Sequence, residues 1–279
     1  MPLSGRTIIV TGAGRGIGAA IVRQCAADGA AVVLVARTET ELEDTKITLT
    51  GTGHRTYPLD VSDRGAVNSF LEFLREARVS VDGLVNCAGI QGPIGALHDI
   101  SLDELEKTFA VNTIGTIAPC AGVLPFFIQL GKGKIVNVSG GGATGPFPRY
   151  SAYAASKAAV IRFTENLAEE YRDMSIDVNA IAPGFVSTRI HEATLQAGEQ
   201  AGKDYYEDTQ RKLVNGAVPP EYAARLASFL LSDAAHGITG KLLSAQWDPW
   251  EDIDFQERLR AEKNLCTLRR IDDKYYYEK

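Results

Sequence analysis

Cysteine, histidine and tryptophan are scarce in this 279-residue chain, and acidic residues outnumber basic ones. The four cysteines and four histidines stand in no metal-ligand or redox spacing, so we predict reduced thiols and no catalytic metal. The 29 Lys and Arg against 35 Asp and Glu give a net charge of −6, which argues against a nucleic-acid partner.

Long apolar runs are also missing. The longest nearly uninterrupted one, residues 117–128, contains Pro119 and Pro125 and is shorter than the roughly 20 residues that a membrane-spanning helix needs. The amino-terminal residues lack the basic segment and long apolar stretch of a signal peptide, so we expect a cytoplasmic protein without membrane association. The 45% of hydrophobic residues is typical of a globular protein with a real core.

Short apolar runs bounded by turn residues alternate with segments of helical period along residues 1–244. This pattern is typical of βαβ units and predicts a doubly wound, Rossmann-type parallel sheet of about seven strands flanked by helices, an α/β fold. No linker divides residues 1–244, so one catalytic domain is expected there, followed by an extension over 245–279 that contains both tryptophans and Tyr275–Tyr277. We expect strands at residues 7–10, 31–35, 56–59, 83–86, 135–138, 177–181 and 241–244.

A glycine-rich turn follows the first expected strand. Glycine permits positive φ and a close approach of backbone to ligand, and the next helix directs free N–H groups toward the turn. A dinucleotide pyrophosphate suits that position, although a purely structural turn is the alternative. The residues of the turn that we predict to hold the cofactor are Gly12, Gly14, Arg15, Gly16, Ile17 and Gly18.

The second expected strand is followed by Arg37, where an NAD site usually offers Asp or Glu to the ribose hydroxyls. Arg15 lies in the glycine turn, so two guanidinium groups can converge on a 2′-phosphate. We therefore favour NADP(H) over NAD(H). Glu39 keeps NAD(H) open, and two solvated surface arginines are the alternative interpretation.

Tyr153 and Lys157 lie four residues apart in an alanine-rich segment of helical character, so both side chains face the same way. An ammonium group beside a phenol favours the phenolate and lowers its pKa from about 10. A phenol tuned in this way can exchange the proton that hydride transfer at a carbonyl requires. The spacing alone is common on helix surfaces, and its meaning depends on the glycine turn.

In this combination the sequence resembles the short-chain dehydrogenase/reductase family over about residues 5–244. The resemblance implies an NAD(P)-dependent oxidoreductase acting on a small-molecule carbonyl or alcohol, and a homodimer or homotetramer. It further implies that Asn112 holds a water in a proton relay through Lys157, and that Thr188 binds the nicotinamide amide. A turn cap at Asp60, a helix kink at Asn112 and an N-cap at Thr188 are the structural alternatives. The other cofactor contacts that the resemblance implies are Asp60 and Val61 at the adenine, Asn86, Ala88 and Gly89 at the ribose side, Tyr153 with Lys157, which grips the ribose, and Pro183 with Gly184 before Thr188.

One position departs from the family. Gly140 stands where the family has a serine that donates a hydrogen bond to the substrate oxygen, and Ser139 precedes it. Either Ser139 takes that role or the hydroxyl is missing, and losing such a donor costs about 3–4 kcal/mol in rate. Tyr150 and Ser151 are further candidates for a substitute donor, with ordinary helix-start residues as the alternative.

The polar segment 189–216 stands where the family folds a mobile lid over the substrate, and it contains Arg189, His191, Tyr205 and Tyr206. The leading hypothesis is an NADP(H)-dependent alcohol dehydrogenase or ketone reductase in which Tyr153 exchanges the proton. An NADP(H)-binding regulator or scaffold with vestigial catalysis is the alternative, because of Gly140 and the extension. A sugar epimerase or dehydratase ranks last.

Overall fold

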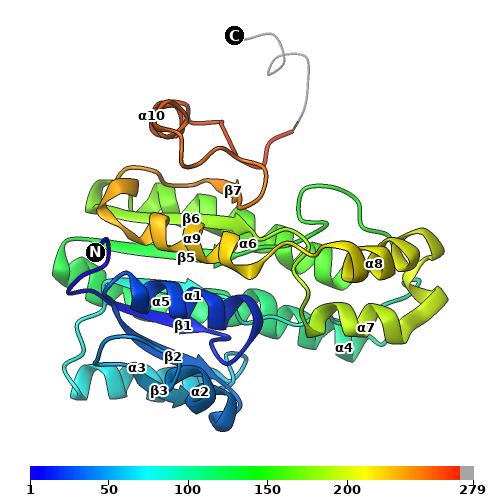
Figure 1. The fold of residues 1–279 in the computed structure, drawn as a ribbon, viewed down its shortest axis with the longest axis horizontal. Coiled ribbons are helices and arrows are strands. Elements are labelled where there is room, and N and C mark those ends of the chain that lie inside the picture. Colours follow the sequence, from blue (N-terminus) through cyan, green and yellow to red (C-terminus); the bar gives the residue numbers. More distant parts are fainter. Residues whose placement is uncertain (271–279) are drawn as a thin grey trace.

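A seven-stranded parallel sheet forms the centre of the computed structural model, which describes residues 1–270 apart from the side chain of Ile190 (Figure 1). The strand order is β3-β2-β1-β4-β5-β6-β7, so the predicted doubly wound fold is confirmed. Every predicted strand is present within two residues of its expected bounds. The strands are β1 (Thr7–Thr11), β2 (Ala31–Ala36), β3 (Arg55–Pro58), β4 (Gly83–Asn86), β5 (Gly133–Val138), β6 (Ile176–Ala182) and β7 (Leu242–Ser244).

The strands are almost uniformly apolar because helices cover both faces of the sheet. In β2, Val32 and Leu34 pack into one core while Val33 and Val35 pack into the other. One face is covered by α1 (Gly16–Ala27), α2 (Glu39–Lys46) and α9 (Pro220–Leu231), and the other by α3 (Arg64–Glu76), α5 (Gly115–Leu130) and α6 (Ser151–Glu170).

A long helical run precedes β5. It consists of α4 (Leu102–Phe109), a π-helical turn over Ala110–Ile114 and α5. Its 29 residues have the length and apolarity to cross a membrane, but 56% of its most apolar window is buried inside the fold. The run is therefore a core helix, and nothing in it indicates a membrane protein.

The predicted lid segment is helical. It forms α7 (Arg189–Ala197), a short turn over Gly198–Ala201 and α8 (Lys203–Asn215), which stand together beyond the carboxyl ends of the strands (Figure 1). Gly198 and Gly202 have positive φ values of 55° and 85°, which is why glycine separates the two helices. The polar composition of this segment reflects its amphipathic helices, with Thr194 and Thr209 fully buried.

The described part of the extension packs against the edge of the sheet, with α10 (Ile253–Ala261) above β7 in Figure 1. The Trp250 ring lies 5.5 Å from that of Phe229 on α9. The carbonyl of Cys266 accepts the Leu242 N–H at 2.7 Å, so the chain covers the edge strand. The tyrosines at 275–277 lie outside the described residues.

Lys241 binds the segment of the extension that follows α10, and we expect Lys241→Met to lower the free energy of unfolding. The Lys241 ammonium, on a side chain only 3% exposed, donates to the carbonyls of Glu262, Lys263 and Leu265 at 2.6, 3.3 and 3.0 Å. Leaving these acceptors without a donor costs about 1–3 kcal/mol. Urea unfolding followed by tryptophan fluorescence measures the loss.

Lys263→Met is the matched control for this variant. The Lys263 side chain is 70% exposed and makes a surface ion pair with Glu169 at 3.5 Å. Such pairs contribute about 0–1 kcal/mol, so the control is expected to unfold almost like the unmodified protein. Equal losses in the two variants would show that Lys241 has no special part in anchoring the extension.

Candidate functional site

A groove of about 510 Å³ runs along the carboxyl ends of β1, β2, β3 and β4. This is the edge where parallel sheets of this topology bind ligands. Most of the residues predicted to hold the cofactor line it. They are Gly12, Gly14, Arg15, Gly16, Ile17, Gly18, Arg37, Asp60, Val61, Ala88, Gly89 and Thr188.

The glycine turn fits a pyrophosphate in its local geometry. A Cβ on Gly18 would lie 2.0 Å from the Gly12 carbonyl oxygen, and one on Gly12, whose φ is +67°, would lie 2.8 Å from the Ala88 nitrogen. Only glycine permits this packing, which leaves the start of α1 open to the groove.

His191 Nδ1, a buried polar atom in a residue of the same groove, has no partner within the described residues.

Glu41 is a groove residue that sequence reasoning missed. Its Oε1 accepts from Arg15 Nη1 at 2.9 Å and from Arg189 Nη1 at 3.2 Å, so one carboxylate joins the glycine turn to the beginning of the lid. The close approach depends on Gly14, where a Cβ would lie 2.9 Å from the Glu41 Cβ. The sequence feature that could have identified Glu41 is its position two residues after Glu39, at the start of α2.

Asp60 shows the geometry of a turn cap as well as lining the groove. Its Oδ1 accepts from the Ser62 nitrogen at 2.9 Å and from the Ser62 hydroxyl at 2.6 Å. Burial opposes ionisation, but the Ser62 hydrogen bonds and the neighbouring Arg37 together lower the pKa of this carboxyl. An ionised Asp60 therefore stands beside one of the two arginines that were predicted to bind a 2′-phosphate.

Tyr153 and Lys157 lie on α6, next to the end of β5. Lys157 Nζ donates to the Val138 carbonyl at 2.8 Å and lies 6.0 Å from the centre of the Tyr153 ring. Burial lowers the pKa of Lys157 to about 8. Burial, followed by the neighbouring Tyr205, raises the pKa of Tyr153 above its usual range. The expectation that Lys157 lowers the pKa of Tyr153 was wrong, because the cost of burying a phenolate dominates.

Asn112 lies in the π-helical turn and is fully buried. Its amide pairs with both backbone groups of Ile90, at 2.8 and 2.9 Å, and donates to the Ser156 hydroxyl at 3.0 Å. A Cβ on Gly89 would lie 3.3 Å from the Asn112 oxygen and 3.4 Å from Lys157 Nζ. Gly89, which lines the groove, therefore packs against these two side chains. The relay role of Asn112 stays a prediction.

Two hydroxyls that were candidates for the missing serine are used inside the protein. Ser139, 2% exposed, donates to the Lys157 carbonyl at 3.4 Å. The Tyr150 hydroxyl, fully buried, donates to Thr194 at 3.0 Å. At Gly140, a Cβ would lie 2.3 Å from the Tyr153 hydroxyl oxygen. The Tyr153 hydroxyl thus occupies the space beside residue 140.

Five predicted cofactor residues do not line the groove, namely Asn86, Tyr153, Lys157, Pro183 and Gly184. The Asn86 amide lies under the strand ends, where it donates to Asn137 Oδ1 at 2.9 Å. Pro183 is buried, and Gly184 packs near Val218 and Gln246. Their part in cofactor binding stays a prediction.

An aromatic cluster joins the lid to the helix of Tyr153. Phe147 and Tyr150 are stacked with ring centres 4.3 Å apart, and Tyr205 from α8 meets both rings edge-on at 4.8 and 5.1 Å. These rings pack with Tyr153 and Ala201. The lid therefore contacts the buried phenol through aromatic side chains.

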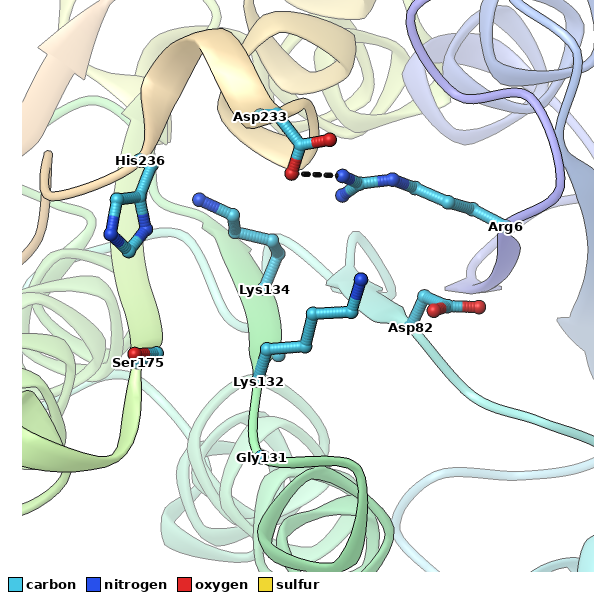
Figure 2. Close-up of a pocket in the computed structure, with 9 residues that line it drawn as sticks. Arg6, Asp82, Gly131, Lys132, Lys134, Ser175, Asp233 and His236 are labelled. Atoms are coloured by element: carbon cyan, nitrogen blue, oxygen red, sulfur yellow. Dashed lines mark ion pairs between the residues drawn. The ribbon is translucent and has the colours of Figure 1, made fainter.

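A second cavity, of about 480 Å³, lies at the opposite, amino ends of the strands (Figure 2). Arg6 pairs with Asp233 and donates to the Leu231 carbonyl at 2.6 Å, and Lys134 pairs with the buried Asp177 at 2.5 Å. The Arg6 pair holds the beginning of β1 to the segment that follows α9, and the Lys134 pair joins the beginnings of β5 and β6. Within residues 1–270 no three His, Cys, Asp or Glu side chains gather as a metal site.

Known proteins that are similar to this chain include several dehydrogenases. A family described as short chain dehydrogenase matches residues 6–198. The chain is 35% identical over 247 residues to 3beta-hydroxysteroid dehydrogenase 1 of Eggerthella lenta, covering 86% of this chain and 92% of that protein. It is 33% identical over 243 residues to D-threitol dehydrogenase of Mycolicibacterium smegmatis, covering 85% and 90%.

Two solved structures have the same architecture. NAD+-bound xylitol dehydrogenase superposes with a TM-score of 0.81 at 26% identity, over 88% of this chain and 98% of that one. Actinorhodin polyketide ketoreductase with NADPH superposes with a TM-score of 0.78 at 27% identity, over 86% and 95%. Similar structures thus bind either nicotinamide cofactor.

Proposed function

Because this chain belongs to the short-chain dehydrogenase family, we propose that it is an NADP(H)-dependent oxidoreductase with Tyr153 as proton donor and acceptor. Membership makes it a dehydrogenase or reductase acting on an alcohol or carbonyl substrate. The observation that carries the proposal is the meeting of the glycine-lined groove with Lys157 at Gly89, beside the helix of Tyr153.

Each side chain has a distinct part in this proposal. When bound, the cofactor supplies or accepts the hydride. Tyr153, whose raised pKa keeps the phenol protonated, donates a proton to the oxygen of a ketone during reduction. Lys157 holds its ammonium next to Gly89 of the groove, and its lowered pKa of about 8 lets it exchange a proton near neutrality. Burial of Tyr153 to 8% exposure excludes bulk water from that transfer.

The cofactor preference rests on charge. Arg15 and Arg37 line the groove beside the end of β2, which supports binding of a 2′-phosphate. Glu41 opposes it, because its carboxylate already binds Arg15. NADP(H) is therefore proposed as the preferred cofactor, with Glu41 limiting the preference.

We expect Glu41→Gln to tighten NADPH binding. The change removes a negative charge next to Arg15 while keeping the shape of the side chain. The Glu41 side chain is 26% exposed, so the expected gain is about three- to tenfold in Kd, which corresponds to roughly 0.7–1.4 kcal/mol. Titration of NADPH and NADH by fluorescence measures both constants without a substrate.

Glu43→Gln is the matched control, because Glu43 lies on the same helix and contacts Lys46 and Thr56. It is expected to change neither constant. An NADPH constant that stays the same in Glu41→Gln would mean that the 2′-phosphate does not bind near Arg15.

A substrate screen tests the function itself. Ketones and secondary alcohols would be offered with NADPH and NADH in parallel, and cofactor absorbance followed. Turnover that is faster with NADPH supports the proposal, and equal rates with both cofactors would contradict the argument from the arginines. Gly140 favours a second candidate, a cofactor-binding regulator, and binding of NADPH without turnover of any substrate would support that candidate.

A further inference from the structure

The proposed reaction leaves one hydrogen-bond donor unaccounted for. Negative charge develops on the substrate oxygen as hydride reaches the carbonyl carbon, and a second donor besides the proton donor stabilises it. Gly140 provides no hydroxyl, and the hydroxyls of Ser139 and Tyr150 are bound to Lys157 and Thr194. Ser151, the remaining candidate, is an exposed residue at the first position of α6. A donor from another element is the alternative to it.

The lid helix α8 brings a third phenol to this place. The Tyr205 ring contacts Phe147 and Tyr150 edge-on and packs with the cluster that contains Tyr153. It lies close enough to Tyr153 to raise that group's pKa. The adjacent Tyr206 packs against the same cluster, but its hydroxyl accepts a hydrogen bond from Gln210 at 3.0 Å. The Tyr205 hydroxyl has Thr209, on its own helix, as a hydrogen-bonding neighbour.

We propose that the Tyr205 hydroxyl donates the second hydrogen bond to the substrate oxygen, in place of the serine that Gly140 replaces. This inference rests on the proposed function. During reduction the substrate carbon gains a hydrogen with its electron pair from NAD(P)H, the C=O π bond breaks, and the oxygen takes the proton of Tyr153. Tyr205 keeps its own proton and stabilises the developing charge.

The proposal gives the lid a catalytic part. Tyr205 reaches the site from α8, whereas Tyr153 and Lys157 are on α6, so the second donor is present only when the lid lies against the aromatic cluster. Substrate binding and completion of the donor pair are thereby coupled, which is the usual benefit of a closing lid.

Tyr205→Phe tests the inference, because it removes the hydroxyl and keeps the ring contacts. With the fastest ketone from the screen, kcat is expected to fall about 10²- to 10³-fold, as for removal of one oxyanion donor, while KM changes little. Tyr206→Phe is the matched control and should keep the kcat of the unmodified enzyme. NADPH titration should give one Kd for all three proteins.

The outcomes separate this inference from the function on which it rests. If Tyr205→Phe keeps its kcat while Tyr153→Phe loses it, the inference is wrong and the proposed function stands. If Tyr205→Phe and Tyr206→Phe lose activity equally, or Tyr205→Phe also loses NADPH binding, the lid has been disturbed as a whole and the specific role is wrong. If the unmodified enzyme turns over neither a ketone nor a secondary alcohol, both proposals fall.

Discussion

Tyr153→Phe is expected to lower kcat/KM for ketone reduction about 10²- to 10⁴-fold, the range typical of a lost general acid. The variant removes only the hydroxyl oxygen from a ring that is 8% exposed, so the packing of α6 is retained. The Kd for NADPH should stay the same, since the ring does not line the groove. Steady-state kinetics with the best ketone, together with the fluorescence titration, measure both quantities.

Tyr171→Phe is the control, because Tyr171 ends the same helix far from the groove and packs against the second core. Its kinetics should match those of the unmodified enzyme. If Tyr153→Phe keeps normal turnover, the proton comes from another group. If the unmodified chain instead has a biological effect that the variant keeps in full, the regulatory candidate is favoured over catalysis.

The features that the sequence predicted well are local in origin. The strands follow from short apolar runs such as Ala31–Val35, which satisfy both faces of a buried sheet. The glycine turn is equally local, because the close contact of Gly18 with the Gly12 carbonyl lies within one strand-turn-helix unit. For these elements neighbouring residues determine the geometry, and the pattern is visible in the chain itself.

The missed features depend on residues that are distant in sequence. Glu41 enters the groove because α2 packs closely against Gly14, and it also meets Arg189 of the lid, 148 residues away. The direction of the Tyr153 pKa depends on how completely the lid and neighbouring strands bury the phenol. Tertiary packing decides both, and no local spacing records it.

The Tyr153 hydroxyl leaves no room for a side chain at position 140. The family's serine position was identified from sequence, but the sequence left open whether Ser139 supplies the hydroxyl. The structure directs Ser139 toward the Lys157 carbonyl and places the Tyr153 hydroxyl against Gly140. The Tyr153 hydroxyl therefore lies in space that a serine at position 140 would need.

Gly140→Ser is accordingly expected to lower activity, although it restores the residue that the family carries. The new Cβ would lie 2.3 Å from the Tyr153 hydroxyl oxygen, 3.1 Å from Cζ and 3.3 Å from Cε1. The phenol has to move by about 1 Å, and a displacement of that size can reduce the rate about 10²-fold. The kcat of the purified variant with the best ketone measures the effect.

Gly141→Ser is the matched control, because among the described residues a Cβ there comes within 4 Å of Phe147 alone, at 3.9 Å. It introduces the same side chain one residue away and is expected to retain normal turnover. A faster Gly140→Ser enzyme would mean that the phenol yields easily and that the serine supplies the missing donor. In that case adding Gly140→Ser to Tyr205→Phe would also restore activity. We expect the double variant to be no faster than Tyr205→Phe, because a serine that displaces Tyr153 cannot compensate for the lost hydroxyl of Tyr205.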